Sequence, residues 1–293
     1  MNISGIEKNV LLAPFTTFNI GGPATFFVKA TTAVELAHAL QEARNEGIAT
    51  FILGGGSDIL VADKGFDGLV IKTDMKEVEF NDESGSVRVG AGMLLTGLIA
   101  QTVKHQLSGL EFSIGVPASV GGAVWANLGA RGSDMSAVVQ SVTIVDEHGD
   151  VRELSNTDCE FLYRDSIFKR KDWTITDVVF TLEKGDKDQI KEVVKELSAL
   201  RLKTQDTGAK TAGCAFRNPT DQTEEAAAKL IDDLGLKGKK IGGAQVSEKH
   251  ANFIINTGYA TADDVAQLIS YIKQQVRDKK GIQLQEEVEY IGF

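Results

Sequence analysis

The feature that most constrains how this chain can fold is a run of three consecutive glycines, Gly54, Gly55 and Gly56. The apolar run at 48–53 predicts a buried strand that ends at these glycines. Glycine tolerates positive φ and lets the backbone come close to a ligand. The N–H groups of such a loop can converge on an anion, with Ser57 and Asp58 adding polar contacts. A tight turn between two strands, with no ligand, is the alternative that this loop alone leaves open.

The segments before the glycine loop predict a βαβ unit. Residues 25–29 are expected to form a strand, and Thr32 and Glu35 have the spacing of a helix capping box. An amphipathic helix is expected at 34–46, and Gly47 is expected to end it. The glycine loop then lies at the carboxyl end of the second strand of this unit.

Two further glycine-rich segments follow. Gly90 and Gly92 resemble the start of a dinucleotide-binding fingerprint, but the third glycine position is occupied by Leu95, which excludes a Rossmann site there. Residues 113–132 are rich in glycine and other small residues and carry almost no charge. Such a segment suits close contact with a large flat ligand. A packing layer of small residues is the alternative.

The rest of the chain predicts alternating strands and helices in two domains. Hairpins are expected at 78–89 and 138–154, strands at 174–182, 243–246, 253–256 and 282–291, and helices at 94–105, 190–201, 224–234 and 263–279. The composition changes near residue 200. We therefore expect one domain at 1–200, with subdomains at about 1–75 and 76–200, and a second domain at 201–293.

Composition narrows the classes of function. The chain has 293 residues and a formal net charge of −10, which argues against a general surface for nucleic acid or anionic membranes. Cys159 and Cys214 lie far apart in the sequence, so neither a disulfide framework nor a cysteine-rich metal site is expected. The first residues lack the pattern of a signal peptide, so none is expected, and the most apolar later stretch is broken by Pro117. We expect a cytoplasmic protein.

Five segments match the motifs of a known enzyme family in order and spacing. They are TTFNIGGPA at 16–24, LGGGSDILVADKGFDGLVI at 53–71, YRDSIF at 163–168, AGCAFRNP at 212–219 and EEVEYIG at 286–292. On these motifs the chain resembles the UDP-N-acetylenolpyruvoylglucosamine reductases, in a compact subclass that resembles type II. The resemblance implies a mixed α+β fold, with an FAD-binding domain of the PCMH or vanillyl-alcohol-oxidase type made of two α/β subdomains. A smaller C-terminal α+β substrate domain is expected to follow it.

The resemblance also implies the reaction and its cofactors. NADPH is expected to reduce a non-covalent FAD, which then reduces the enolpyruvyl ether of a UDP-sugar during peptidoglycan precursor synthesis. The protein is expected to act as a monomer without nucleic acid, membrane or metal. The implied cofactor contacts are Gly54, Gly55, Gly56, Ser57, Asp58, Ile114, Gly115, Ser119, Gly121, Gly122, Ala123 and Asn127.

The chemistry requires a cation near the substrate carboxylate and an acid near C2. Arg164 matches the family's catalytic arginine, and a guanidinium can hold a carboxylate with two hydrogen bonds. Without the resemblance, a surface ion pair with Asp165 would be the favoured interpretation of Arg164. Cys214 matches the proton donor, which is a serine in many members. A thiol with a pKa of about 8.5 is mostly protonated at neutral pH, and a small buried hydrophobic residue is the alternative for this cysteine.

Glu287 matches the family's catalytic glutamate, although the strand pattern favours its neighbour. Alternation places Leu284, Glu286 and Val288 on one face, so Glu286 is the carboxylate on the apolar side. We assign the role to Glu287 on the motif and keep Glu286 as the alternative. The implied substrate contacts are Tyr163, Asn218 and His250.

The chain departs from the family pattern at several places. Asp58 replaces an asparagine next to the expected diphosphate, Ala118 and Leu128 replace a glycine and an alanine, and Asp206 replaces a proline. Two other functions compete with the reductase. One is another FAD-dependent oxidase or dehydrogenase of the same fold, and the other is a non-catalytic relative that binds FAD. The set Arg164, Cys214 and Glu287 argues against the first, and these departures keep the second open.

Overall fold

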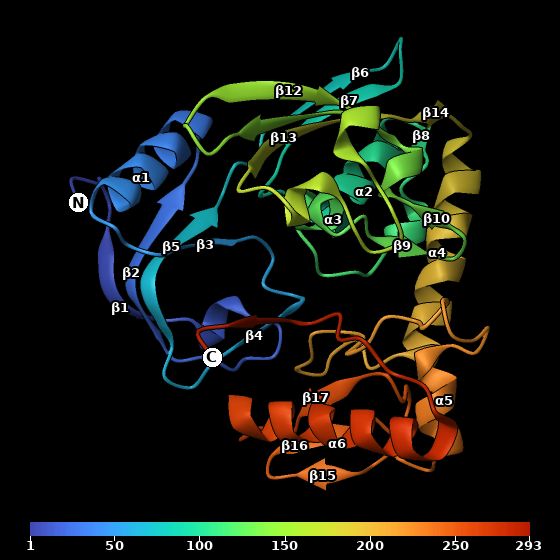
Figure 1. The fold of residues 1–293 in the computed structure, drawn as a ribbon. Coiled ribbons are helices and arrows are strands. Elements are labelled where there is room, and N and C mark those ends of the chain that lie inside the picture. The colour runs from blue at the N-terminus through green and yellow to red at the C-terminus, as the bar shows by residue number, and fades with distance from the viewer. The chain divides into compact units, whose positions relative to one another are not determined.

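The computed structural model describes residues 1–293. Figure 1 shows the elements in chain order. The chain divides into two compact units, one made of 1–8, 26–55 and 68–200, and the other of 9–25, 56–67 and 201–293. The division near residue 200 falls inside helix α4 (Lys187–Thr204), between Leu200 and Arg201. Two N-terminal segments belong to the second unit, an assignment that the sequence pattern did not suggest.

A four-stranded sheet lies next to helix α1, and most of its residues belong to the first unit. Its strand order is β1-β2-β5-β3, and the strands are β1 (Glu7–Leu11), β2 (Pro23–Ala30), β3 (Thr50–Leu53) and β5 (Phe66–Thr73). Helix α1 (Ala33–Asn45) begins at Thr32, whose hydroxyl accepts the Glu35 N–H at 3.1 Å. The Glu35 carboxylate accepts the Thr31 N–H at 2.7 Å, so one half of the expected capping box forms at Thr32 and the return bond goes to Thr31. Strand β5 lies between the two strands of the expected βαβ unit.

A second sheet in this unit carries the larger apolar core. Its order is β12-β11-β13-β7-β6, with β6 (Val78–Asn81), β7 (Ser86–Gly90), β11 (Val139–Val145), β12 (Val151–Ser155) and β13 (Thr174–Thr181). Both expected hairpins, β6–β7 and β11–β12, are confirmed as antiparallel pairs. Helices α2 (Leu95–Lys104) and α3 (Val120–Trp125) contribute buried apolar side chains to this core. Short pairs join β8 (Leu107–Ser108) to β14 (Glu183–Lys184) and β9 (Gly129–Ala130) to β10 (Ser133–Asp134).

The second unit is built on helix α6 (Ala262–Lys280) and a three-stranded antiparallel sheet. The sheet consists of β15 (Lys240–Ile241), β16 (Ala244–Val246) and β17 (Ile254–Asn256). Strand β18 (Glu289–Ile291) pairs in parallel with β4 (Ile59–Val61), and helix α5 is Ala227–Asp233. The expected strand at 282–291 is therefore wrong in extent, because only its last three residues pair as a strand.

Helix α6 follows directly from its sequence. Thr261 and Asp264 form a capping box at its start, and Gly281 ends it at φ 72°. The carboxylate of Asp63 accepts the Ala262 N–H at 2.9 Å, which adds a second cap. The apolar face at helical spacing is fully buried, and its members are Val265, Leu268, Ile269, Ile272 and Val276.

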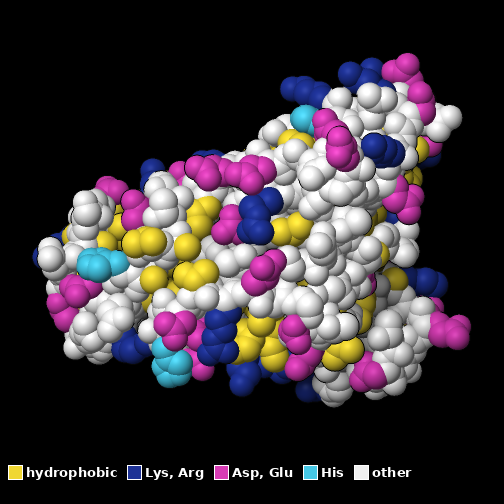
Figure 2. Space-filling view, turned by 90° about the horizontal axis from the view of Figure 1, so that it is seen from above, with side chains coloured by type: hydrophobic (Ala, Val, Ile, Leu, Met, Phe, Trp, Pro, Cys, Tyr) yellow, Lys and Arg dark blue, Asp and Glu magenta, His cyan; other side chains and the backbone are white.

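The surface carries both charge signs. Figure 2 shows Lys and Arg side chains interspersed with Asp and Glu over the visible face, with no broad basic area. None of the helices combines the length and the apolar character that a membrane crossing requires.

Candidate active site

The glycine loop packs against the start of helix α3. A Cβ added at Gly54 would lie 2.6 Å from the Ser119 Oγ, and one at Gly55 would lie 2.8 Å from the Ser119 N and 2.9 Å from the Pro117 O. At Gly55 the close atoms are backbone atoms, so only glycine fits there, whereas at Gly54 the close atom belongs to the Ser119 side chain. The close approach that the sequence predicts is thus made in part to another segment of the chain.

Ser119 is the centre of this contact. It is the N-cap of α3, and its Oγ accepts the N–H of Gly55 at 3.1 Å and the N–H of Gly122 at 3.3 Å. The N–H groups of Gly54 and Gly115 make no hydrogen bond within the protein. These two donors fit an anionic or carbonyl-bearing ligand such as FAD, which needs exposed backbone donors in a glycine-rich loop.

The other expected cofactor residues of the first unit lie just before helix α3 or within and after it. Gly115, at φ 77°, follows Ile114, whose N–H donates to Glu111. Gly121 lies against Ala91, because its N–H donates to the Ala91 O at 2.9 Å. Ala123 is buried in the larger apolar core.

Gly56, Ser57 and Asp58 belong to the second unit. Gly56 has φ 65°, and a Cβ there would collide with the Phe15 carbonyl oxygen. Its own carbonyl accepts the Thr17 N–H at 2.9 Å. The Asp58 carbonyl accepts the Glu289 N–H at 3.0 Å, which starts the β4–β18 pair. The backbone of this part of the loop is therefore fixed by the N-terminal and C-terminal segments.

Asn127, expected as a cofactor contact, connects the small-residue segment to the Arg164 turn. It is buried, with 3% of its surface exposed, and has φ 41°. Its amide nitrogen donates to the Leu162 O at 2.9 Å, and its amide oxygen accepts the Ser136 N–H at 3.1 Å. Asn127 thus holds the loop that carries the candidate catalytic arginine.

Arg164 occupies the corner of a tight turn. Leu162 and Asp165 exchange backbone hydrogen bonds across the turn, and Arg164 adopts φ 54°. A left-handed conformation is unfavourable for a residue with a side chain and often marks a functional position. The guanidinium donates to the Gly129 O at 2.9 Å and lies 5.7 Å from the ring centre of Tyr163. Tyr163 itself is half exposed, which suits a substrate contact.

Gly55→Ala should weaken FAD binding strongly, because its Cβ would meet backbone atoms that cannot move independently. Gly208→Ala is the matched control, since a Cβ at Gly208 meets nothing within 4 Å and the backbone there is not left-handed. We expect the FAD dissociation constant, measured by flavin fluorescence on apoprotein, to rise at least about tenfold for Gly55→Ala. An unchanged constant would remove Gly55 from the cofactor loop.

Cys214 lies in an extended segment between two others in the second unit. It pairs with Phe253 in an isolated bridge, and the neighbouring Ala215 N–H donates to the Asn252 O at 2.7 Å. On the other side, the Glu287 N–H donates to the Ala215 O at 2.9 Å. The structure thus places Glu287 opposite Ala215, one residue along the chain from Cys214. Cys214 is partly exposed, unlike the fully buried Cys159.

His250 lies beside this group. Its ring packs against Phe253 at 4.6 Å between ring centres, and its backbone N–H donates to the Ser247 Oγ at 2.9 Å. Burial, with a smaller contribution from Lys237, lowers the pKa of His250, so the ring is neutral at neutral pH. Asp206, which departs from the family pattern, accepts a hydrogen bond from the Ser247 hydroxyl and supports the same turn.

Asn218 has a contact that sequence analysis missed. Its amide oxygen accepts the Ala227 N–H at 3.0 Å at the start of α5. An Asn eight or nine residues before a helix gives no local capping signal, so only the fold shows this contact. The implied role of Asn218 as a substrate contact stays a prediction.

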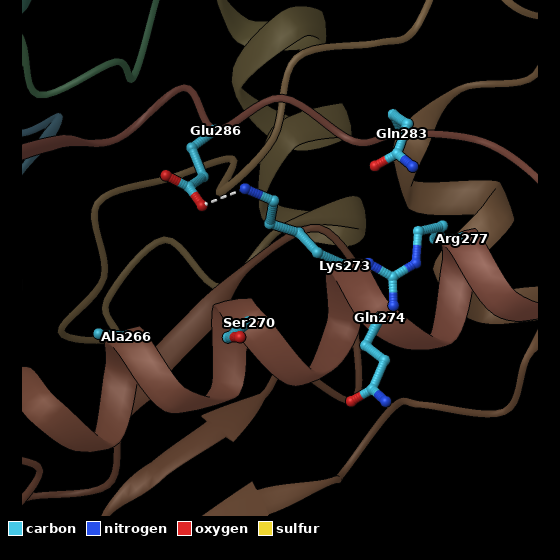
Figure 3. A pocket seen from close by; sticks show the side chains of 7 residues that line it. All are labelled: Ala266, Ser270, Lys273, Gln274, Arg277, Gln283 and Glu286. Atoms are coloured by element: carbon cyan, nitrogen blue, oxygen red, sulfur yellow. Dashed lines mark hydrogen bonds and ion pairs between the residues drawn. The ribbon is translucent and has the colours of Figure 1, made fainter.

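Glu286 and Glu287 have different surroundings. Figure 3 shows the Glu286 carboxylate directed at α6, where it forms an ion pair with the Lys273 ammonium at 2.7 Å. This pair borders a groove of about 290 Å³ whose lining residues are Ala266, Ser270, Lys273, Gln274, Arg277, Gln283 and Glu286. Phe216 and Glu286 pair across an antiparallel bridge, so Glu287 faces the opposite side together with Ala215. Glu287 stays the assigned catalytic carboxylate on the motif, with Glu286 as the alternative.

Glu287→Gln should slow reduction of the substrate and spare oxidation of NADPH, because it keeps the shape and removes the proton-holding carboxylate. Glu286→Gln is the matched control, since it removes only a partly exposed ion pair worth about 0–1 kcal/mol. Rapid-mixing measurements of the two half-reactions give the comparison. Damage from Glu286→Gln alone would assign the role to Glu286.

Comparison with known proteins defines first the class and then the family. Residues 24–155 match the FAD binding domain family, and residues 203–291 match the family described as UDP-N-acetylenolpyruvoylglucosamine reductase, C-terminal domain. The chain is therefore a flavoprotein of two matched domains. It belongs to the UDP-N-acetylenolpyruvoylglucosamine reductase family.

Individual relatives match over nearly their whole length. The reductase of Anoxybacillus flavithermus is 41% identical, covering 99% of this chain and 96% of the relative. That of Prochlorococcus marinus is 36% identical over all of both chains. The crystal structure of the enzyme MurB from Thermus caldophilus superimposes with a TM-score of 0.82, at 34% identity and 98% coverage of both chains. The expected family and mixed α+β fold class are confirmed.

Proposed function

We propose that the protein uses NADPH to reduce UDP-N-acetylglucosamine enolpyruvate to UDP-N-acetylmuramate, a step of peptidoglycan precursor synthesis. The observation that carries this proposal is the similarity to reductases of this name over nearly the full length of both chains. The family structure with a TM-score of 0.82 supports it, because the likeness includes both matched domains.

FAD, when bound, would supply the hydride chemistry that connects NADPH with C3 of the enolpyruvyl ether. In this proposal the chain's own residues handle charge and protons. Arg164 holds the substrate carboxylate, where negative charge develops as C3 receives the hydride. Cys214 gives a proton to C2, and Glu287 is the second acid–base group. Tyr163, Asn218 and His250 contact the substrate.

The proposal also covers the cellular compartment and the oligomeric state of the protein. Both cysteines are free thiols, which is usual in a reducing compartment, so we place the protein in the cytoplasm. We propose that it acts as a monomer. Size-exclusion chromatography with light scattering measures this directly, and a dimer would contradict it.

Product analysis tests the reaction. The purified holoprotein is incubated in D₂O with NADPH and the enolpyruvyl sugar nucleotide, and the product is examined by mass spectrometry and NMR. We expect UDP-N-acetylmuramate with deuterium at C2 from solvent. NADPH oxidation that requires oxygen and leaves the sugar nucleotide unchanged would instead indicate an oxidase of the same fold.

A further inference from the structure

Lys72 lies directly beneath the glycine loop. It is near the end of β5, where it pairs in parallel register with Leu53, the last residue of β3. Its ammonium donates to the Gly54 O at 2.7 Å and to the Thr73 O at 3.3 Å. A largely buried lysine is costly unless its charge is satisfied, so these two carbonyl contacts are a specific arrangement.

The peptide between Gly54 and Gly55 is held from both sides. A trans peptide directs its C=O and its N–H in opposite directions, and the chain contains no cis peptide. The C=O receives the Lys72 ammonium, while the N–H donates to the Ser119 Oγ at 3.1 Å. A charge on the carbonyl side polarises the peptide and strengthens the hydrogen bond on the N–H side.

The Ser119 hydroxyl ends this chain of hydrogen bonds. Its oxygen accepts two N–H groups, from Gly55 and Gly122, which uses both of its lone pairs. Its own hydrogen meets no acceptor in the protein, although the residue is only 1% exposed. A buried hydroxyl hydrogen without an acceptor is left for a ligand oxygen.

We propose that Lys72 is a positioning residue for FAD, because it fixes the Gly54–Gly55 peptide and thereby orients the loop and the Ser119 hydroxyl toward the anionic diphosphate. The inference rests on FAD binding and is independent of the sugar nucleotide. A failure of the reductase proposal would leave it intact, since the test below measures FAD binding alone.

The test uses Lys72→Met, which keeps the length of the side chain and removes the ammonium. Apoprotein is titrated with FAD while flavin fluorescence is followed, and the unfolding temperature of the apoprotein is recorded in parallel. We expect the dissociation constant to rise at least about tenfold, the usual effect of losing a hydrogen bond from a charged group. Lys76→Met is the matched control, because it removes an exposed ammonium that pairs with Asp74. The FAD dissociation constant of Lys76→Met should stay within about twofold of the wild-type value.

A double-mutant cycle with Ser119→Ala separates positioning from general destabilisation. If Lys72 acts through the Gly55 N–H and Ser119, Lys72→Met should have little further effect on FAD binding in the Ser119→Ala background. Lys72→Gln replaces Lys72→Met if the latter does not fold. A dissociation constant within about twofold of the wild type, or fully additive effects of the two substitutions, would overturn the proposal.

Discussion

Replacing Cys214 by alanine should slow overall turnover by about 10²–10⁴-fold, the usual contribution of a positioned general acid. Alanine removes the only side-chain proton at this position. Cys214→Ser should keep measurable turnover, because a hydroxyl also carries one proton on a γ atom. NADPH oxidation in the absence of the sugar nucleotide should be unchanged in both variants, since no proton is delivered to C2 in that half-reaction.

Rapid mixing of reduced enzyme with the sugar nucleotide, without oxygen, measures the affected step. Deuterium incorporation at C2 in D₂O reports whether the proton still arrives. If Cys214→Ala turned over at the wild-type rate, the proton would come from another group. Cys214 would then be a packing residue between Phe253 and the C-terminal segment.

The second cysteine provides an internal control for thiol reagents. Burial raises the pKa of Cys159 to about 12, and its side chain is fully buried, so it should be inert. Cys214 is partly exposed. Alkylation should therefore inactivate the wild type, substrate should protect it, and Cys214→Ser should resist the reagent.

Arg164→Lys should lower the rate of substrate reduction by about 10²-fold or more, in the range seen when one donor to a developing oxyanion is removed. An ammonium carries the same charge but cannot reproduce the planar two-point contact with a carboxylate. The turn fixes the arginine backbone at φ 54°, and the side chain reaches the Gly129 carbonyl at 2.9 Å. A lysine ammonium at this position cannot donate to the Gly129 carbonyl and hold the substrate carboxylate at the same time.

Arg170→Lys is the matched control for this prediction. Arg170 lies on the same segment and pairs with Asp165 and Glu160 at the surface, where such pairs contribute little. In the Arg170→Lys variant, NADPH oxidation and substrate reduction should both stay near the wild-type rates. Equal loss of both half-reactions in Arg164→Lys would indicate that the residue maintains the turn and takes no part in substrate reduction.

Much of the fold could be predicted from local sequence. The hairpins β6–β7 and β11–β12 have alternating apolar residues on both sides of a polar turn, and α6 has caps at both ends of a clear apolar stripe. Contacts between distant segments could not be predicted. The strand expected at 282–291 shortens because residues 285–287 pair only with 215–217, in an isolated bridge.

The candidate site shows the same limit. The glycine loop and Arg164 were predicted from motifs, but the support of the site comes from residues without a local signal. Asn127 donates a hydrogen bond to the Arg164 turn at Leu162, 35 positions further along the chain. Lys72 donates one to the Gly54 carbonyl, 18 positions earlier. A lysine directly after the apolar run 69–71 was the one available sign, because a charged residue at the end of a buried strand needs a partner.

The most direct test of the account is the pair of half-reactions followed through flavin absorbance without oxygen. The account predicts that NADPH bleaches the bound flavin of the purified protein. Addition of the enolpyruvyl sugar nucleotide should then restore the oxidised spectrum, with one product molecule formed for each NADPH consumed. A flavin that stays reduced after the sugar nucleotide is added, and returns only with oxygen, would contradict it.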